Sequence, residues 1–404
     1  MLSKDAFVYL VNISNSRRIA MKLLIMAGEV SGDYQAAFLA EELKRRDPSL
    51  QILGTGGAHM RRAGVRLLHE TVHLSSVGFL EAIRHVLPLR GVYRDVTRVV
   101  RDERPDLAVL VDNQGFNLAV AKVLKSLSVP VVFYFPPQIW VGPRLFAGSV
   151  ARNSRLVISA FPLEAEIYRR DYGANAVSFG HPLLDIAKPS GDPDDALRAH
   201  GLDPAKPVVG LMPGSRPQEV RVLAPPMLEA ARIIKSRHPA MQFLMPVAAD
   251  HVRPALKAAV ERAGLRESVR LIDGGDHTAT SRCQAVLTCS GTATLELSLL
   301  GVPSVVAYRL DPVSHWIARK LSTTPYVAMP NVLLDEMAVP EIIQYRIDGA
   351  HFAAKAIEIL EEPERASRLR RRLAEIPGHL GSSGAVSRAA ERILEEARQA
   401  SAST

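Results

Sequence analysis

The sequence predicts an α/β protein of two doubly wound parallel-sheet domains that face each other across a cleft. From Lys22 to about Leu310, short apolar segments alternate with amphipathic helical segments, the pattern of buried parallel strands joined by helices. A proline-rich stretch interrupts this alternation near its middle. The chain has 404 residues, which is more than one hydrophobic core usually supports.

Residues 21–187 are expected to form the N-terminal domain, after an N-terminal extension of residues 1–20. Tyr34–Arg46 has its apolar residues at helical spacing and is expected to be a helix. Short apolar or β-branched runs separated by polar segments indicate parallel strands in this half. These are Leu23–Met26, Ile52–Gly54, Leu107–Val111, Val129–Tyr134, Leu156–Ile158 and Ala176–Phe179.

A second domain, residues 208–365, is expected to follow a linker of residues 188–207, which contains four prolines and several aspartates. Leu223–Arg237 and His251–Ala263 are expected to be helices in it. Residues 366–404 form an arginine-rich helical tail that can pack back on the N-terminal domain. The strands expected in this domain are Val208–Met212, Gln242–Pro246, Val269–Ile272, Ala285–Thr288 and Ser304–Tyr308.

Composition excludes some classes of protein and leaves others open. Two cysteines, Cys283 and Cys289, are too few for a disulfide framework and match no zinc pattern, which favours a reducing compartment. No apolar run is long enough for a spanning helix. The net charge of +8 fits an arginine-rich solvated surface, or attraction to anionic lipid or a phosphorylated substrate. Nucleic acid is the weakest interpretation, because no binding motif accompanies the charge.

Three turns that follow strands are candidate binding sites. Gly28–Asp33 is rich in glycine and precedes a helix, but it is neither a dinucleotide fingerprint nor a P-loop. Pro213–Arg216 places an arginine after a glycine, where it can pair with a phosphate or simply face solvent. Ser290–Glu296 begins a helix with small hydroxyl residues, which suits either a helix cap or a diphosphate site.

In this order the motifs resemble those of lipid-A-disaccharide synthases. The resemblance covers roughly Lys22 to Gln344. Beyond the three turns it depends on four further segments: Gly180-His181-Pro182-Leu183, Val305-Val306-Ala307-Tyr308-Arg309, Met329-Pro330-Asn331 and Val339-Pro340-Glu341 with Gln344.

The resemblance implies a GT-B glycosyltransferase with two Rossmann-like domains, which inverts the sugar configuration and needs neither metal nor cofactor. The implied donor is UDP-2,3-diacylglucosamine and the implied acceptor is 2,3-diacylglucosamine 1-phosphate (lipid X). They join in a β-1,6 link with release of UDP, a step of lipid A biosynthesis.

The resemblance also implies roles for individual residues. Asp112 is the candidate general base, at the carboxyl end of its strand. Arg216 is expected to act in catalysis and to neutralise the diphosphate. The other UDP-binding candidates are Ser290, Gly291, Thr292, Ala293, Thr294, Glu296 and Asn331, with Glu296 on the ribose. The candidates on the acceptor side of the cleft are Gly28, Glu29, Ser31, Gly32, Asp33, Asn117 and His181.

The chain departs from the family pattern at two places in the acceptor domain. Gly115 stands where the family usually has a second aspartate, and Val141–Arg144 replaces the usual Ala-Trp-Arg after Trp140. Two alternatives therefore stay open. One is another UDP-sugar enzyme of this architecture, with a different acceptor or as a UDP-N-acetylglucosamine 2-epimerase. The other is a silent paralogue that binds lipid or nucleotide.

The segment Val77–Val99 mixes large apolar residues with arginines. It fits either an interfacial membrane segment or a helix packed on the core. Because both implied substrates carry acyl chains, we expect a cytoplasmic protein attached peripherally to the anionic inner face of the inner membrane. A homodimer is a further candidate assembly, and no nucleic-acid partner is expected.

Overall fold

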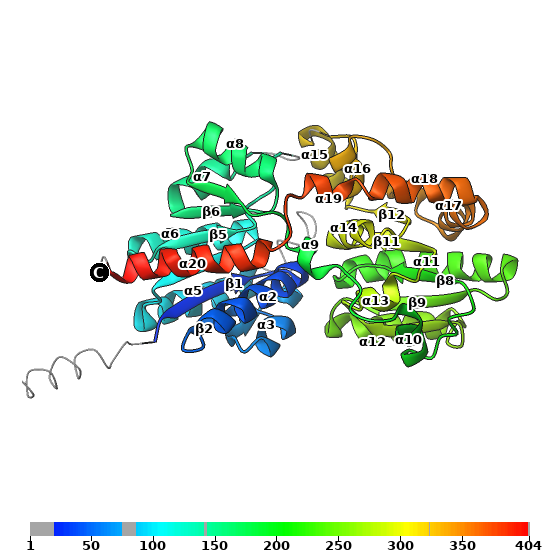
Figure 1. Cartoon of the computed structure of the whole chain (residues 1–404), viewed down its shortest axis with the longest axis horizontal. Coiled ribbons are helices and arrows are strands. Elements are labelled where there is room, and N and C mark those ends of the chain that lie inside the picture. The colour runs from blue at the N-terminus through cyan, green and yellow to red at the C-terminus, as the bar shows by residue number, and fades with distance from the viewer. Residues whose placement is uncertain (1–19, 75–85, 141–143, 323, 403–404) are drawn as a thin grey trace, which may run out of the picture.

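The computed structural model describes residues 20–74, 86–140, 144–322 and 324–402. Two α/β domains lie side by side along the long axis of the molecule (Figure 1). The predicted N-terminal extension lies outside the described residues except for Ala20. Each domain has its own parallel sheet with helices on both faces, so the predicted fold class is confirmed.

The first domain contains a seven-stranded sheet in the order β3-β2-β1-β4-β5-β6-β7. All its strand pairs are parallel. The strands are β1 (Lys22–Ala27), β2 (Gln51–Gly56), β3 (Arg66–Glu70), β4 (Leu107–Val111), β5 (Val131–Tyr134), β6 (Leu156–Ser159) and β7 (Ala176–Ser178).

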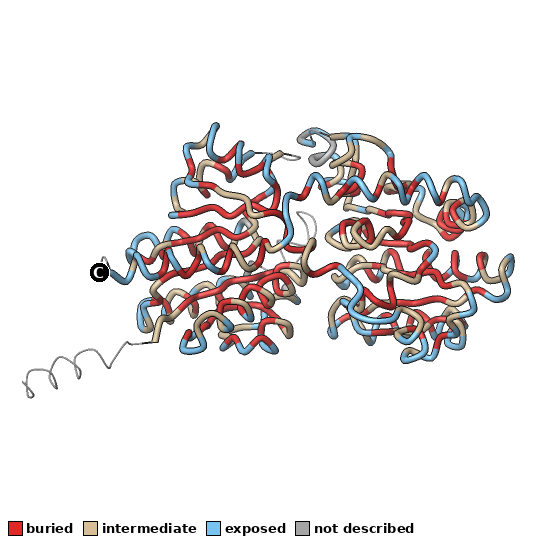
Figure 2. Tube along the Cα trace, in the orientation of Figure 1, coloured by how far each residue is buried: buried red, intermediate tan, exposed pale blue. Residues whose placement is uncertain are grey.

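Side chains along β1 point alternately to the two faces of this sheet, and both faces are covered by helices. Leu23 and Ile25 pack in one cluster, together with α2 (Val30–Arg46), α3 (Ala58–Arg62) and α20 (Ala385–Ala402). Leu24 and Met26 point to the other face. That face is covered by α5 (Val86–Glu103), α6 (Gln114–Ser126), α7 (Ala147–Asn153) and α8 (Pro162–Tyr172). Figure 2 shows the buried residues concentrated on the strands and on the facing sides of the helices.

The second domain repeats this plan with a six-stranded parallel sheet in the order β10-β9-β8-β11-β12-β13. The strands are β8 (Val208–Met212), β9 (Gln242–Val247), β10 (Val269–Asp273), β11 (Ala285–Cys289), β12 (Ser304–Tyr308) and β13 (Glu341–Ile343). One face packs on α11 (Pro217–Arg237), α12 (Arg253–Arg262), α17 (Gly349–Glu361) and α18 (Pro363–Leu373). The other face packs on α10 (Pro193–Ala199), α13 (His277–Thr280) and α14 (Thr292–Leu299). Two more helices, α15 (Pro312–Leu321) and α16 (Met329–Leu334), follow β12.

The stretch 188–207 differs from the linker that its prolines and aspartates predict. It contains α10, whose Leu197 is fully buried in a cluster of the second domain. Pro193 occupies the first turn of that helix, and the carboxylate of Asp192 caps it by accepting from the amides of Asp194 and Asp195 at 2.9 and 3.0 Å. Of the residues that predicted a linker, Pro193 and its neighbouring aspartates therefore begin a helix, whereas Pro189, Pro204 and Pro207 lie outside it.

The chain passes between the domains twice, and the two crossings touch. On the first, α9 (Leu183–Ile186) follows His181; on the second, α20 follows α19 (Ile376–His379). The His181 amide donates to the carbonyl of Leu380 at 2.8 Å, and the Gly384 amide donates to the Asp185 carboxylate at 2.6 Å. A Cβ on Gly180 would lie 2.4 Å from the carbonyl oxygen of Ser382, so a glycine is required for this approach. After the second crossing α20 packs on α2 of the first domain (Figure 1).

The segment Val77–Val99 is only partly described, because Phe79, Leu80 and Ile83 lie outside the described residues. In its described part, α5 buries Val92 and Val96 in the core of the first domain. Arg90, Arg94 and Arg98 are exposed. The core-packed interpretation therefore holds for the apolar residues of this part. Within the described ranges, no helix is both long enough and apolar enough to cross a bilayer.

Candidate active site

The two sheets each have a topological switch point, where the strand order reverses and ligands of doubly wound folds bind. In the first domain it lies between β1 and β4, where Ala27 is paired with Val111. In the second it lies between β8 and β11, where Met212 is paired with Thr288. The turns after these four strands contain most of the candidate residues, so the fold brings together segments that are far apart in the sequence.

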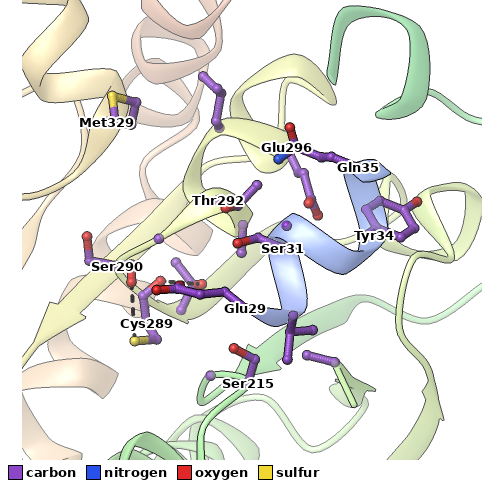
Figure 3. A pocket seen from close by; sticks show the side chains of 18 of the residues that line it. Glu29, Ser31, Tyr34, Gln35, Ser215, Cys289, Ser290, Thr292, Glu296 and Met329 are labelled. Carbon is purple, nitrogen blue, oxygen red and sulfur yellow. Dashed lines mark hydrogen bonds between the residues drawn. The ribbon is translucent and has the colours of Figure 1, made fainter. Parts of the chain in front are cut away.

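A cavity of about 1090 Å³ lies between the domains and is lined by these turns. Figure 3 shows the two sides. Ser31, Tyr34 and Gln35 extend from α2 and Glu29 from the turn before it, and Cys289, Ser290, Thr292 and Glu296 lie opposite. The predicted site residues that line the cavity are Glu29, Ser31, Gly32, Asp112, His181, Arg216, Ser290, Gly291, Thr292, Ala293 and Glu296. Those that do not are Gly28, Asp33, Asn117, Thr294 and Asn331.

The buried polar members of the second group hold loops in place. The carboxylate of Asp33 accepts from the amides of Gly57, His59 and Met60 at 2.6 to 3.1 Å, which fixes the start of α3. The carboxamide of Asn331 has 0% exposure and donates to the Val339 carbonyl at 2.9 Å. The Thr294 hydroxyl donates to the Gly291 carbonyl at 2.8 Å. Their polar atoms are already used within the protein.

Asp112 lies in a strained turn at the end of β4. Both Asp112 and Asn113 have left-handed backbones, with φ of 51° and 46°, which is costly for residues with a Cβ and is typical of functional sites. The side chain of Asn117 holds this turn by donating to the carbonyls of Val111 and Asp112 at 3.1 and 2.6 Å. One carboxylate oxygen of Asp112 accepts from the Asn113 amide at 2.9 Å.

The surroundings of Asp112 make it a better proton acceptor than an ordinary aspartate. Burial of its carboxylate, followed by the negative charge of Glu29, raises the pKa of Asp112 to about 7. The Asn113 amide and the Arg216 guanidinium act in the opposite direction. A base with a pKa near the working pH is efficient in proton abstraction.

Arg216 joins the two domains at the same place. Its Nη2 contacts the Glu29 carboxylate across the cleft at 2.5 Å, and its Nη1 contacts Glu219 at 2.7 Å. The side chain is 19% exposed, and its buried Nε has no hydrogen-bond partner within the described part of the chain. Two carboxylates therefore fix the guanidinium, while its Nε–H is left unpaired within the described part of the chain.

The start of α14 forms the opposite side of the anion site. The amide of Ser290 donates to the Ala307 carbonyl at 2.9 Å and its hydroxyl to the Val327 carbonyl at 2.8 Å, so Ser290 fixes the turn. The next residues begin the helix, whose first amides have no carbonyl partner within it and form the positive end of the helix dipole. One turn further on, Glu296 lies 3.4 Å from Nε2 of His277.

His181 lines the cavity but is not suited to proton transfer. Its burial lowers its pKa to about 3, so the ring is neutral at physiological pH. Its Nδ1 accepts from the Leu183 amide at 3.1 Å, and its ring packs against Phe135 and Phe161. The structure therefore places it at the interdomain crossing as a packing residue.

Glu164, which sequence analysis missed, also lines the cavity. It is 1% exposed, and burial raises its pKa to about 8. The Ile139 amide donates to one of its oxygens at 3.2 Å, and the Ser159 hydroxyl lies 2.5 Å from the other. A glutamate in the first turn of an amphipathic helix is usually solvated, so its sequence carries no signal of this burial.

In the described part of the chain, no group of three or more histidine, cysteine, aspartate or glutamate side chains could hold a metal ion. Among the described residues that line the cavity, Arg216 is the one arginine or lysine.

A family model described as lipid-A-disaccharide synthetase matches residues 23–387. The chain belongs to the lipid-A-disaccharide synthase family. It is 35% identical over 375 residues to the synthase of Geobacter metallireducens, which covers 93% of this chain and 97% of that protein. It is 36% identical over 379 residues to the synthase of Anaeromyxobacter dehalogenans, and the match covers 94% of this chain and 98% of that protein. The predicted family and function are confirmed: the chain is a glycosyltransferase of the family that condenses UDP-diacylglucosamine with lipid X in lipid A biosynthesis.

Solved structures support the fold class alone. A putative UDP-N-acetylglucosamine 2-epimerase from Listeria monocytogenes superposes with a TM-score of 0.62 at 13% identity, over 93% of this chain and 94% of that chain. A UDP-N-acetylglucosamine 2-epimerase from Neisseria meningitidis, bound to UDP-N-acetylglucosamine, superposes with a TM-score of 0.61 at 12% identity. The superposition covers 94% of this chain and 100% of that chain. At sequence identities this low, the structural similarity supports the fold but does not favour the epimerase alternative over the lipid-A-disaccharide synthase family.

Of the two departures from the family pattern, one is described. Gly115 is exposed in the first turn of α6, with no atom within 4 Å of the position of a Cβ. Residues 141–143 lie outside the described residues.

Gly28 allows the first test of this geometry. A Cβ at this position would lie 1.8 Å from the carboxamide nitrogen and 2.9 Å from the Cβ of Asn113, so Gly28→Ala must displace the side chain next to Asp112. We expect turnover to fall by about tenfold to a hundredfold, because small misplacements of reacting groups cost that much. UDP affinity should not change. Gly115→Ala, where a Cβ has open space, is the matched control. Equal turnover of both variants in a UDP-release assay would contradict the assigned role of the turn.

The pKa of Asp112 predicts the pH dependence. The base works when ionised, so kcat/KM should fall about tenfold per pH unit below about 7 and level off above it. Asp112→Asn should abolish transfer at every pH while UDP still binds. Because the pKa of Glu164 is also raised toward this range, the pH profile of kcat/KM for Glu164→Gln identifies which carboxylate is responsible. If the fall in kcat/KM below about pH 7 persists in this variant, it belongs to Asp112. Disappearance of that fall in Glu164→Gln would assign it to Glu164 instead.

Proposed function

We propose that the two domains divide the transfer reaction between Asp112 and Arg216, with the acceptor in the first domain and the UDP-sugar in the second. The observation that supports this division is the direct contact between the two switch points, at which Arg216 meets Glu29 beside Asp112. A donor held by the second domain therefore presents its sugar to the turn that contains the base.

In the proposed reaction, the 6-hydroxyl oxygen of the acceptor attacks C1 of the donor glucosamine. The bond from C1 to the phosphate oxygen breaks, and the hydroxyl proton passes to the Asp112 carboxylate. The oxygen of Asp112 that does not accept from Asn113 is the one available for that proton. Attack from the face opposite the leaving UDP inverts the configuration and forms the β-1,6 link.

The leaving UDP gains negative charge, and the second domain is arranged to meet it. We assign this task to the guanidinium of Arg216, through its open Nε, and to the amides of Gly291, Thr292 and Ala293. We assign Glu296 to the ribose hydroxyls, since a carboxylate accepts hydrogen bonds from both. Asn331 and Thr294 support the same pocket indirectly, by holding its loops.

The direct test is a UDP-release assay with UDP-2,3-diacylglucosamine and 2,3-diacylglucosamine 1-phosphate. We expect full turnover in saturating EDTA, because arginine and helix amides meet the leaving-group charge in place of a metal. Activity lost on chelation and restored by magnesium would overturn this mechanism. Binding of UDP without release of UDP from the diacylated pair would support the silent paralogue instead.

We further propose a cytoplasmic location with peripheral attachment to an anionic membrane surface. Both substrates carry acyl chains, and α5 presents exposed Arg90, Arg94, Arg98 and Arg101 on the side away from its buried valines. Each basic residue near an anionic surface contributes about 1 kcal/mol, which salt screens.

Liposome flotation tests this attachment. With vesicles that contain anionic lipid, replacing Arg90 and Arg94 with serine should weaken binding at low salt. The matched control replaces Arg262 and Arg266, which are exposed at the end of α12 in the second domain and change the net charge equally. Equal losses in both variants would mean that net charge alone, and not this face of α5, attracts the membrane.

We also propose that the protein forms a homodimer. Tyr345 is 89% exposed and Met337 is 58% exposed, and both lie close in sequence to β13, which is an edge strand. Exposed apolar residues beside an edge strand are typical of an interface between copies, and analytical ultracentrifugation would show whether the protein is dimeric.

A further inference from the structure

One buried polar group in the cavity has no role in the reaction described above. Gln35, on α2 of the first domain, is 6% exposed and lines the cavity. Its side-chain oxygen Oε1 is buried and has no hydrogen-bond partner among the residues that the structure describes. Buried polar atoms are almost always paired, so an unpaired carboxamide that faces a cavity indicates a ligand.

The side chains around Gln35 come from both domains. In Figure 3 the carboxamide of Gln35 extends from α2 toward Glu296 on α14, with Tyr34 beside it. The Tyr34 hydroxyl lies 3.3 Å from the position of a Cβ on Gly275, which belongs to the loop after β10. Burial and then the charge of Glu296 raise the pKa of Tyr34 to about 12, so the phenol is neutral beside that carboxylate. The first domain thus reaches the part of the cavity assigned to the ribose.

The chemistry of this corner fits a diol. The Glu296 carboxylate can only accept hydrogen bonds, whereas a carboxamide both donates and accepts. A ribose has two neighbouring hydroxyls, each of which can donate to one group and accept from another. A hydroxyl also pairs with the carboxamide in either of its two orientations, because it can donate to the oxygen or accept from the nitrogen. A phosphate oxygen, which only accepts, could not satisfy Oε1.

We propose that Gln35 binds a ribose hydroxyl of the donor nucleotide, so that the ribose is held between Glu296 of the second domain and Gln35 of the first. This inference rests on the proposed function, since it assumes that UDP occupies the second domain. It makes nucleotide binding a further link between the domains, besides the contact of Arg216 with Glu29. Donor affinity then depends on the domains being closed together, and the bound ribose is shielded from water.

A purely structural role for Gln35 makes a different prediction. If its carboxamide only fills space, Gln35→Leu keeps most of the volume and removes an unpaired polar atom, which leaves stability unchanged or raises it. UDP affinity would then not change. Gln218 offers a matched control, because its Oε1 is also buried and without a partner in the described residues, but the residue does not line the cavity.

The experiment is calorimetric titration of the wild-type protein, Gln35→Leu and Gln218→Leu with UDP, 2′-deoxy-UDP and 3′-deoxy-UDP. We expect Gln35→Leu to bind UDP about three- to tenfold more weakly, the value of one hydrogen bond to a neutral group. The difference in affinity between wild type and Gln35→Leu should vanish for the deoxynucleotide that lacks the bonded hydroxyl. Neither protein can then form the hydrogen bond. Gln218→Leu should bind all three like the wild type.

Each other outcome has a definite meaning. Unchanged UDP affinity in Gln35→Leu, or an equal loss with all three nucleotides, overturns the inference and leaves the proposed function standing. A wild-type protein that binds no UDP overturns the proposed function, and the inference with it. If Gln35→Leu melts at a lower temperature than the wild type, Gln35→Met, which is unbranched like glutamine, replaces it in the same titrations.

Discussion

The contact between Arg216 and Glu29 is the interaction on which the rest of the site depends. It joins the turn after β8 to the turn after β1, and so places the switch points of two separate sheets against each other. The negative charge of Glu29 also raises the pKa of Asp112, while Arg216 lowers it. The charges of Glu29 and Arg216 therefore act together on the Asp112 carboxylate. In the proposed mechanism, donor binding at Arg216 and acceptor activation at Asp112 are therefore coupled through one guanidinium.

The fold could be predicted from the sequence because its signals are local. Strands such as Leu107–Val111 are continuous apolar runs, which are typical of strands in a sheet that is covered on both faces. Glycine-containing turns mark the ends of several of these strands. The edge strands β3 and β13 escaped prediction, since Arg66–Glu70 and Glu341–Ile343 are short and partly exposed and have no such run. Within the predicted linker, the helix α10 escaped prediction, because proline and aspartate occur at helix starts as well as in loops.

The site was predictable only in part, for a physical reason. Motif residues fall into those that face the cavity, such as Arg216, and those that hold the turns, such as Asp33 and Asn117. Both kinds carry the same side-chain chemistry, and only the direction of each side chain separates them. Glu164 and Gln35 were missed for the converse reason: both are polar residues of helices, and nothing in the neighbouring sequence marks them as buried.

The most direct test of the account compares UDP with uridine on the wild-type protein and on Arg216→Ala. If Arg216 and the start of α14 hold the diphosphate, the wild type should prefer UDP over uridine strongly. The variant should lose about 1.5–3 kcal/mol of that preference, the value of a hydrogen bond to a charged group, with its uridine affinity unchanged. A preference for UDP that is the same in both proteins would contradict the account, because the diphosphate would then be bound elsewhere.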